Sequence, residues 1–333
     1  MSCAYLAFTE RGLALAQQLA AACPGPVARC GAGGPGLDEW TAAQFAASDA
    51  LIYIGAVGIA VRAIAPHCRT KAADPAVVVL DECGRFAVPL LSGHLGGANA
   101  LARRLAAVCG AVPVITTATD LHGLFAVDEW AKRQNCVVAE PERIKQVSGA
   151  LLAGKRVHFT ADWPIQGTPP AGVLPAADGS ADFALTLTPT GQALHIVPRI
   201  AVLGIGCRRG TAAEHLEAAF VAFCCETGLA PQGVAAAASI DLKRDEPGLA
   251  AFCQDHGWDM DFYTAAQLRA VPGSFTASGF VTSVTGVDNV CERAAVLASG
   301  GTLLLPKWAR DGVTFAAALR PFAPDWRWRD DEP

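Results

Sequence analysis

The sequence predicts an α/β protein: two α/β domains, each a sheet flanked by helices, joined by a small α+β central region. Two observations support this prediction. Short apolar runs alternate with stretches of helical periodicity in the first and last thirds of the 333 residues, as is typical of sheets covered by helices. Between these thirds the chain becomes rich in Pro, Gly and Ala. We therefore expect an N-terminal domain at residues 1–135, a central region at 136–198 and a C-terminal domain at 199–323.

The N-terminal domain is expected to alternate between strands and helices. The run 76–80 is continuously apolar, as a strand buried on both faces should be. A turn at 81–85 separates it from 86–91, so the two are expected to form a hairpin, with Pro89 near an edge or a bulge. Gly110 is expected to cap the helix before it. The expected strands are 3–8, 50–54, 76–80, 86–91 and 112–117, and the expected helices are 12–22, 57–64, 98–108 and 124–134.

The central and C-terminal regions are interpreted in the same way. Residues 163–180 are expected to form a loop because Pro, Gly and Ala dominate there. Thr211 and Asp288 precede helical stretches and are expected to be N-caps. The central region is expected to contain a helix at 142–152 and strands at 156–160, 183–187 and 194–197. The C-terminal domain is expected to contain strands at 200–203, 234–240, 302–305 and 313–319, an extended segment at 279–284, and helices at 212–226, 247–256 and 289–299.

The composition argues against several classes of protein. Hydrophobic residues make up 52% and charged residues 17%, so the chain has ample apolar surface to bury and is not mainly disordered. A formal net charge of −5 without basic runs argues against nucleic-acid binding. We expect a cytoplasmic protein without a membrane segment, because apolar stretches are short and the N-terminus lacks the basic region of a signal peptide. The 12 cysteines include no C-x-x-C pair, which is typical of reduced, buried thiols rather than metal ligands.

Three glycine-rich segments, 55–58, 92–97 and 204–210, are expected to be turns between a strand and a helix. The first amides of a helix are unpaired, so such a turn can hold a carboxylate or phosphate. The alternative is ordinary turn geometry without a ligand. The third segment departs from the dinucleotide-binding fingerprint, because Arg209 stands where a glycine is required. The residues expected to contact an anionic ligand are Gly55, Gly58, Arg62, Ser92, Gly93, Gly96, Gly97, Asn99, Thr117, Gly204, Gly206, Cys207, Arg208, Lys243 and Asp288.

His94 is the most interesting titratable residue. It lies in the second glycine-rich segment, which we expect at the C-terminal edge of a sheet, where ligand sites of α/β proteins gather. Histidine titrates near neutrality and suits proton transfer. Asp120 follows the next expected strand and could orient His94 or bind substrate. The alternatives are that His94 only hydrogen-bonds the turn and that Asp120 caps a helix.

Several blocks of the sequence together resemble a known family. The N-terminal blocks are GAVGIAVR at 55–62, DPAVVVLDE at 74–82, SGHLGGAN at 92–99 and ITTATD at 115–120. The C-terminal blocks are GIGCRRG at 204–210, SIDLK at 239–243 and GVDNVCE at 286–292. They resemble, in order, the cobalt-precorrin-5A hydrolases of the CbiG type, from anaerobic cobalamin biosynthesis. The likeness spans nearly the whole chain and is loosest in the middle.

The resemblance implies an activity and a substrate. The family opens the δ-lactone of cobalt-precorrin-5A, and a carbon then leaves with its methyl group as acetaldehyde, giving cobalt-precorrin-5B. The substrate is a macrocycle rimmed with carboxylates, which suits several anion sites. As a mechanistic hypothesis, His94, oriented by Asp120, activates water, and amides of the 93–97 turn stabilise the oxyanion. The substrate carries the cobalt, so no metal or other cofactor is expected from the protein.

Two other functions stay open. The first is a non-catalytic tetrapyrrole-binding or carrier protein of the same pathway, since the C-terminal domain alone resembles a small protein of the aerobic route. The second is a nucleotide-dependent enzyme that uses the 204–210 segment. Transient contacts with neighbouring pathway enzymes are a further expectation.

Overall fold

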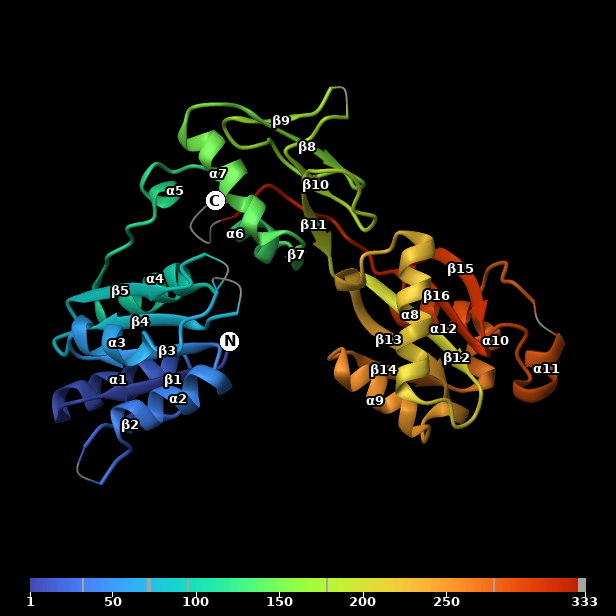
Figure 1. The fold of residues 1–333 in the computed structure, drawn as a ribbon, viewed down its shortest axis with the longest axis horizontal. Coiled ribbons are helices and arrows are strands. Elements are labelled where there is room, and N and C mark those ends of the chain that lie inside the picture. Colours follow the sequence, from blue (N-terminus) through green and yellow to red (C-terminus); the bar gives the residue numbers. More distant parts are fainter. Residues whose placement is uncertain (32, 71–72, 95, 178, 278, 329–333) are drawn as a thin grey trace. The chain divides into compact units, whose positions relative to one another are not determined.

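The computed structural model describes the chain except residues 32, 71–72, 95, 178, 278 and 329–333. It divides into two compact units, residues 1–130 and the chain from residue 131 onward. Each unit is described by itself below (Figure 1). Strands and helices alternate in both, so the expected α/β class is confirmed. The boundaries of the three expected regions stay a prediction.

The first unit is built on a sheet with strand order β2-β1-β3-β4-β5-β6. The strands β2, β1, β3 and β4 run parallel, β5 is antiparallel to β4, and β6 is parallel to β5. The expected hairpin of β4 and β5 is therefore confirmed, and Pro89 pairs beside a register shift, as expected. The strands are β1 (Cys3–Ala7), β2 (Val27–Arg29), β3 (Ala50–Ile54), β4 (Ala76–Leu80), β5 (Phe86–Leu91) and β6 (Val112–Pro113).

Helices cover both faces of this sheet. Alternate strand residues enter two different cores, so that Tyr5 packs with Leu19 and Leu105 while Leu6 packs with Trp40 and Ile64. This explains why β1, β3 and β4 are continuously apolar: each strand has both faces buried. The helices are α1 (Glu10–Ala22), α2 (Leu37–Ala47), α3 (Val57–Ile64), α4 (Ala98–Cys109), α5 (Ala118–Leu121) and α6 (Val127–Arg133), whose last residues belong to the second unit.

The second unit contains two five-stranded sheets in the described residues. The first has the order β7-β11-β10-β8-β9 and carries α7 (Ile144–Leu152), which follows a 3₁₀ turn at Pro141–Arg143. One strand, β9, lies in the segment expected to be a loop. The strands are β7 (Cys136–Val138), β8 (Val157–Ala161), β9 (Val173–Pro175), β10 (Phe183–Leu185) and β11 (Leu194–Pro198).

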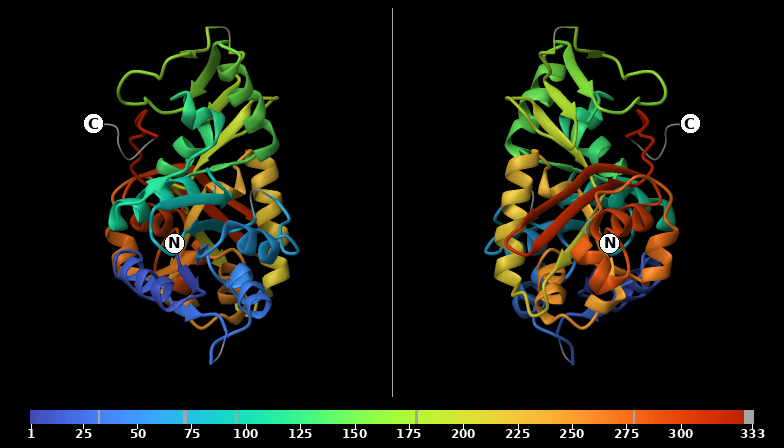
Figure 2. Two further views of the ribbon diagram at one scale, coloured as in Figure 1. Left: turned by 90° about the vertical axis from the view of Figure 1, so that its left-hand side faces the viewer. Right: turned by 90° about the vertical axis from the view of Figure 1, so that its right-hand side faces the viewer.

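The other sheet has the order β14-β13-β12-β16-β15. The aromatic rings of α8 and α9, among them Phe220 and Phe252, pack on one face, and α10 and α12 contribute Leu268 and Ala294 to the other. The long β15–β16 hairpin is visible in Figure 2. The elements are β12 (Ala201–Cys207), α8 (Ala213–Thr227), β13 (Val234–Ile240), α9 (Pro247–Asp255), β14 (Asp259–Tyr263), α10 (Ala265–Ala270), α11 (Gly279–Thr285), α12 (Cys291–Ser299), β15 (Thr302–Arg310) and β16 (Val313–Leu319), with short 3₁₀ turns at Pro231–Gly233 and Asp241–Lys243.

Some local expectations were wrong. The segment 112–117 is a strand only at Val112–Pro113, and 279–284 is helical rather than extended. Thr211 is not an N-cap: its hydroxyl donates to the Arg208 carbonyl, and α8 begins after Ala212. Asp288 is not an N-cap either, because the Asn289 side chain accepts the Glu292 amide at the start of α12.

None of the helices in the described part of the chain has the length and apolar character needed to cross a bilayer. The cysteines are free thiols, and only some of them are buried. Burial raises the pKa of Cys136, Cys224 and Cys253 to about 12, so these thiols stay protonated at neutral pH.

Candidate active site

The turn at residues 92–97, called the His94 turn below, joins β5 to α4 and folds tightly on itself. The amides of Gly97, Ala98 and Asn99 donate to carbonyls of the same turn, at 2.9–3.1 Å. Gly97 has φ 85°, and a Cβ on Gly96 would lie 2.3 Å from the Ser92 Cβ, so both positions require glycine. Since the Gly97 amide is already used, it is not the free oxyanion donor that we expected. Leu95 lies outside the described residues.

The His94 turn lies at the edge of the sheet opposite to the one we expected. Because β5 is antiparallel to β4, Leu91 at the end of β5 pairs with Val77, near the start of β4. Ile54 at the end of β3 pairs with Leu80, the last residue of β4. The turns after β5 and β3 are therefore at opposite edges, and the expected position at the carboxyl edge of the parallel strands was wrong.

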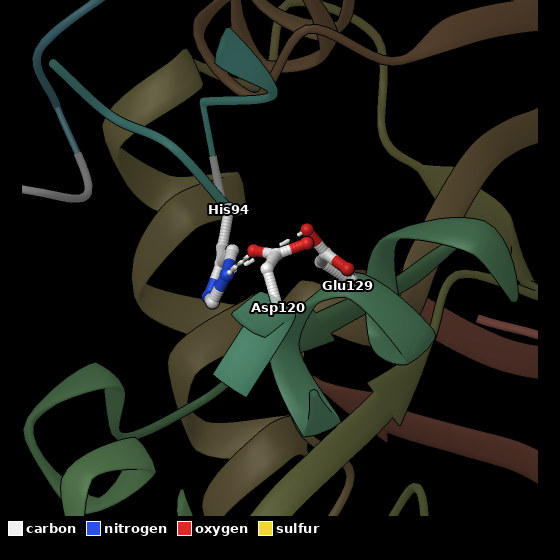
Figure 3. Close-up of side chains that lie close together, drawn as sticks. All are labelled: His94, Asp120 and Glu129. Atoms are coloured by element: carbon white, nitrogen blue, oxygen red, sulfur yellow. Dashed lines mark hydrogen bonds and ion pairs between the residues drawn. The ribbon is translucent and has the colours of Figure 1, made fainter. Parts of the chain in front are cut away.

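Asp120 approaches His94 because β5 and β6 run parallel and end at the same edge. The Asp120 Oδ2 atom lies 2.9 Å from His94 Nε2. Figure 3 shows the two side chains directed toward one another. The same oxygen accepts from the Asn99 amide at 3.0 Å and from the Thr117 hydroxyl at 2.5 Å, and the Arg103 guanidinium pairs with the other oxygen. The sequence analysis offered contact between His94 and Asp120 as one possibility, and the structure adds Asn99 and Thr117, which were expected to contact the ligand, to the same network.

Two further carboxylates come from the first turn of α6. Asp128 Oδ2 lies 3.4 Å from His94 Nδ1, and Glu129 Oε1 lies 3.7 Å from His94 Nε2 (Figure 3 shows Glu129). The side chains of Asp128 and Glu129 are 6% and 13% exposed. One oxygen of Asp128 is buried without a hydrogen-bond partner in the described structure. We call His94, Arg103, Asp120, Asp128 and Glu129 the His94 cluster.

The carboxylates determine the protonation state of His94. Burial disfavours the charged ring, but hydrogen bonds to Asp120 and Asp128 and the charge of Glu129 outweigh it and raise the pKa of His94 to about 10. Burial opposes ionisation of Asp120 too, yet its hydrogen bonds with His94, Thr117 and Arg103 hold the pKa of that carboxyl well below its ordinary value. Burial raises the pKa of Glu129. At neutral pH His94 is therefore an imidazolium, which can donate a proton but cannot accept one.

Three of these residues have the spacing of a metal site. One ligand atom from each of His94, Asp120 and Glu129 lies within 4.8 Å of the other two. A cation there would have to share Asp120 with the Arg103 guanidinium, and like charges repel at this range. The Asp120 oxygens also already accept several hydrogen bonds. The cluster is better described as a hydrogen-bonded network, and the absence of a protein-supplied metal stays a prediction.

Some of the other first-unit residues that were expected to contact an anionic ligand have structural explanations. The Ser92 hydroxyl donates to the Asp74 carbonyl at 2.8 Å. A Cβ on Gly55 would lie 2.6 Å from the Phe8 ring, and one on Gly58 would lie 3.4 Å from the Arg62 guanidinium. Gly55, Gly58 and Arg62 belong to the turn after β3 and to α3. The segment 55–58 therefore does not join the His94 turn at one edge.

The expected turn at 204–210 is half strand. Gly204 and Gly206 lie in β12, and a Cβ on Gly204 would stand 1.8 Å from the Cys291 carbonyl oxygen. This glycine allows α12 to pack against the strand, which is a structural role. The turn proper begins at Arg208, whose amide donates to the Gly312 carbonyl at 3.2 Å.

One hydrogen bond joins this turn to the segment between β13 and α9. Glu246 accepts from the Gly210 amide at 2.7 Å and pairs with Lys243 Nζ at 3.0 Å. Lys243 and Cys207 are close enough for the ammonium to lower the thiol pKa, although burial outweighs this and the pKa of Cys207 is raised. Asp288 is held by the Arg293 guanidinium, with both oxygens in contact. Lys243 and Asp288 thus already have protein partners.

Sequence reasoning missed Asp128 and Glu129. Two adjacent acids at the start of a helix are usually explained by their favourable interaction with the positive end of the helix dipole. For that reason they were not considered as site residues. The available sequence signal was that these two acids interrupt an apolar run. In the structure Phe125, Val127 and Trp130 of that run are fully or nearly fully buried. A carboxylate inside such an apolar run needs a buried partner.

The fold and the cluster together define an α/β protein with a buried histidine–carboxylate network suited to proton transfer. Family models for "Cobalamin synthesis G N-terminal", "Cobalamin biosynthesis central region" and "Cobalamin synthesis G C-terminus" match residues 39–120, 125–182 and 201–318.

Similar proteins agree with these models. A cobalt-precorrin-5A hydrolase of Salmonella typhimurium is 38% identical over 83% of this chain and 83% of its own length. One of Priestia megaterium is 33% identical over 82% of this chain and 79% of its own length. Protein CobE of a Sinorhizobium species is 34% identical over 31% of this chain and 68% of its own length. The chain belongs to the cobalt-precorrin-5A hydrolase family, as the sequence blocks indicated.

Proposed function

We propose that this protein is the hydrolase that opens the δ-lactone of cobalt-precorrin-5A and releases acetaldehyde to give cobalt-precorrin-5B. The relatives named cobalt-precorrin-5A hydrolase cover 83% and 82% of the chain. The family models match the residues of the His94 cluster and residues 201–318. The single observation in the structure that supports this function is the partly buried pairing of His94 with Asp120. An imidazolium in a partly buried site can stabilise the negative charge that develops when water attacks a lactone carbonyl.

The substrate's chemistry supports the same assignment. The macrocycle carries acetate and propionate carboxylates, and cations such as Arg62 and Arg208 provide positive potential although the whole chain is acidic. The substrate also carries cobalt, which can accept electron density during the carbon–carbon cleavage. We propose no metal or cofactor of the protein's own, an anaerobic pathway, a cytoplasmic location and transient contacts with neighbouring pathway enzymes.

Acetaldehyde release tests this function. Purified protein is incubated anaerobically with cobalt-precorrin-5A, and acetaldehyde is trapped as its hydrazone. The mass of the corrinoid product is measured by mass spectrometry. We expect stoichiometric acetaldehyde with the wild type and a strongly reduced rate with His94→Asn. The matched control is His256→Asn, because His256 pairs with a carboxylate, Glu217, outside the cluster. Acetaldehyde release by His94→Asn at the wild-type rate would overturn the role of this site.

The alternative functions predict other results. A tetrapyrrole carrier would bind cobalt-precorrin-5A and shift its absorbance spectrum without releasing acetaldehyde. A nucleotide-dependent enzyme would be stabilised in a thermal-shift panel with ATP or NAD. The second alternative is the weaker one, because Gly204 and Gly206 lie in a strand and Arg209 stands at the third glycine position of the fingerprint.

A further inference from the structure

We propose that Glu129 is the general base that activates water for lactone opening, with His94 as the proton donor. This assignment rests on the proposed function and concerns which residue acts as base and which as acid in that reaction. Neither the family models nor the names of the relatives assign a role to Glu129. It also replaces the hypothesis that His94 itself takes the proton from water.

The geometry of His94 leaves no lone pair for an incoming proton. Nε2 faces Asp120 at 2.9 Å, with Glu129 at 3.7 Å, and Nδ1 faces Asp128 at 3.4 Å. A ring with carboxylates at both nitrogens carries a proton on each, because a lone pair directed at a carboxylate would be repelled. A base must therefore come from elsewhere in the cluster.

Two of the three carboxylates are unsuited to this role. Asp120, whose side chain is 4% exposed, accepts from His94, Asn99, Thr117 and Arg103, so its lone pairs are occupied. Asp128 is 6% exposed and lies on the Nδ1 side of the ring, away from the Nε2 side where Glu129 lies. Its position suits a group that keeps the Nδ1 proton in place.

Glu129 combines the properties that a base needs. Its side chain is partly exposed, its carboxylate forms no hydrogen bond that we find among the described residues, and it lies on the Nε2 side of the imidazolium. The groups that face it are His94, Asp120, Asp128 and Arg103. Burial and the two aspartates raise the pKa of Glu129, against the pull of His94 and Arg103, and a carboxylate with a raised pKa is the stronger base.

The step balances within the cluster. Glu129 takes one proton from water while the water oxygen bonds to the lactone carbonyl carbon. The tetrahedral intermediate collapses, the acyl carbon–oxygen bond of the lactone breaks, and His94 gives the Nε2 proton to the leaving alkoxide. The products are a carboxylic acid and an alcohol, as hydrolysis requires. Glu129 then returns its proton to His94 across the 3.7 Å contact, which regenerates both groups.

The test compares Glu129→Gln with a matched control, Glu39→Gln. Both glutamates are the second acid in the first turn of a helix, but Glu39 is exposed on α2. We expect Glu129→Gln to lower kcat by about 10²–10⁴-fold, with substrate affinity, followed by absorbance titration, nearly unchanged. Glu39→Gln should behave as wild type. The acidic limb of the wild-type pH–kcat/KM profile should disappear in Glu129→Gln, and Glu129→Asp should recover part of the rate.

Several outcomes separate this inference from the proposed function. A wild type that releases no acetaldehyde contradicts the function, whereas an active wild type with an equally active Glu129→Gln contradicts only the inference. Activity that is lost in EDTA and restored by Mn²⁺ would show a metal centre and also overturn it. Independently of turnover, ¹⁵N NMR should show both ring nitrogens of His94 protonated at pH 8, and a neutral ring would refute the assignment.

Discussion

Replacing His94 by Gln should remove a pH-dependent contribution to the free energy of unfolding. In the folded protein the ring is held charged by Asp120, Asp128 and Glu129, and its pKa is about 10. In the unfolded chain an ordinary histidine has a pKa of about 6.5. The folded state therefore keeps a proton that the unfolded chain releases, and the two states respond differently to pH.

The size and sign of the effect follow from these values. Below about pH 6.5 the ring is charged in both states and its contribution to the free energy of unfolding is complete. From there to about pH 10 the unfolded chain has lost the proton, so the free energy of unfolding falls by about 1.4 kcal/mol per pH unit. The total loss is at most roughly 5 kcal/mol. Above about pH 10 the contribution is gone.

Urea denaturation at pH 6, 7, 8 and 9 measures this contribution to the free energy of unfolding. Unfolding of the first unit is followed by brief proteolysis and quantification of peptides from residues 1–130. The His94→Gln curve is subtracted from the wild-type curve, which cancels the titration of thiols and tyrosines common to both. His256→Gln, which alters a histidine outside the cluster, is the control. A difference between wild type and His94→Gln that stays constant from pH 6.5 to 9 would refute a charged His94.

Three other predictions concern single contacts. Asp120→Asn should lower the pKa of His94, measured by NMR titration, because the ring loses its nearest negative charge; an unchanged pKa would contradict the network. Gly204→Ala should cost the second unit about 3 kcal/mol or more in urea denaturation, because the Cβ would meet the Cys291 carbonyl, whereas Gly149→Ala in α7, where a Cβ meets nothing, should be neutral or stabilising. Glu292→Gln should cost about 2–3 kcal/mol, since the carboxylate accepts from the Thr276 amide and hydroxyl and from the Lys307 amide; a loss below 0.5 kcal/mol on the same assay would contradict this.

The sequence predicted best those elements whose two faces are both buried. Strands β3, β4 and β13 have the predicted bounds, because a mainly apolar run between turn residues has few other interpretations. Prediction from the sequence failed where tertiary contacts determine the secondary structure. Strand β14 is an edge strand carrying Asp259 and Asp261 and shows no apolar run. Segment Gly279–Thr285 is rich in β-branched residues, which locally favour extended structure, yet it is helical.

The candidate site could be predicted only as far as its residues lie next to a recognisable turn. His94, Asn99 and Asp120 were found because glycines and a strand end mark their neighbourhood. Asp128 and Glu129 come from a helix that no local pattern connects with the His94 turn, and only the folded chain shows that they surround the ring. Their presence changes the chemistry, since a histidine with one carboxylate can be a base and a histidine with three is an acid.

The direction of one strand has a consequence for substrate binding. Since β5 runs against β4, the His94 turn and the turn at 55–58 lie at opposite edges of one sheet. Strand β4 has five residues, and at about 3.3 Å per residue it separates these edges by roughly 15 Å. A carboxylate held at the start of α3 could not belong to the same part of a substrate as the lactone attacked beside His94. If both contacts exist, they involve different sides of a large macrocycle. Substitutions at 55–58 should then change KM and leave kcat unchanged, whereas substitutions in the His94 cluster should change kcat.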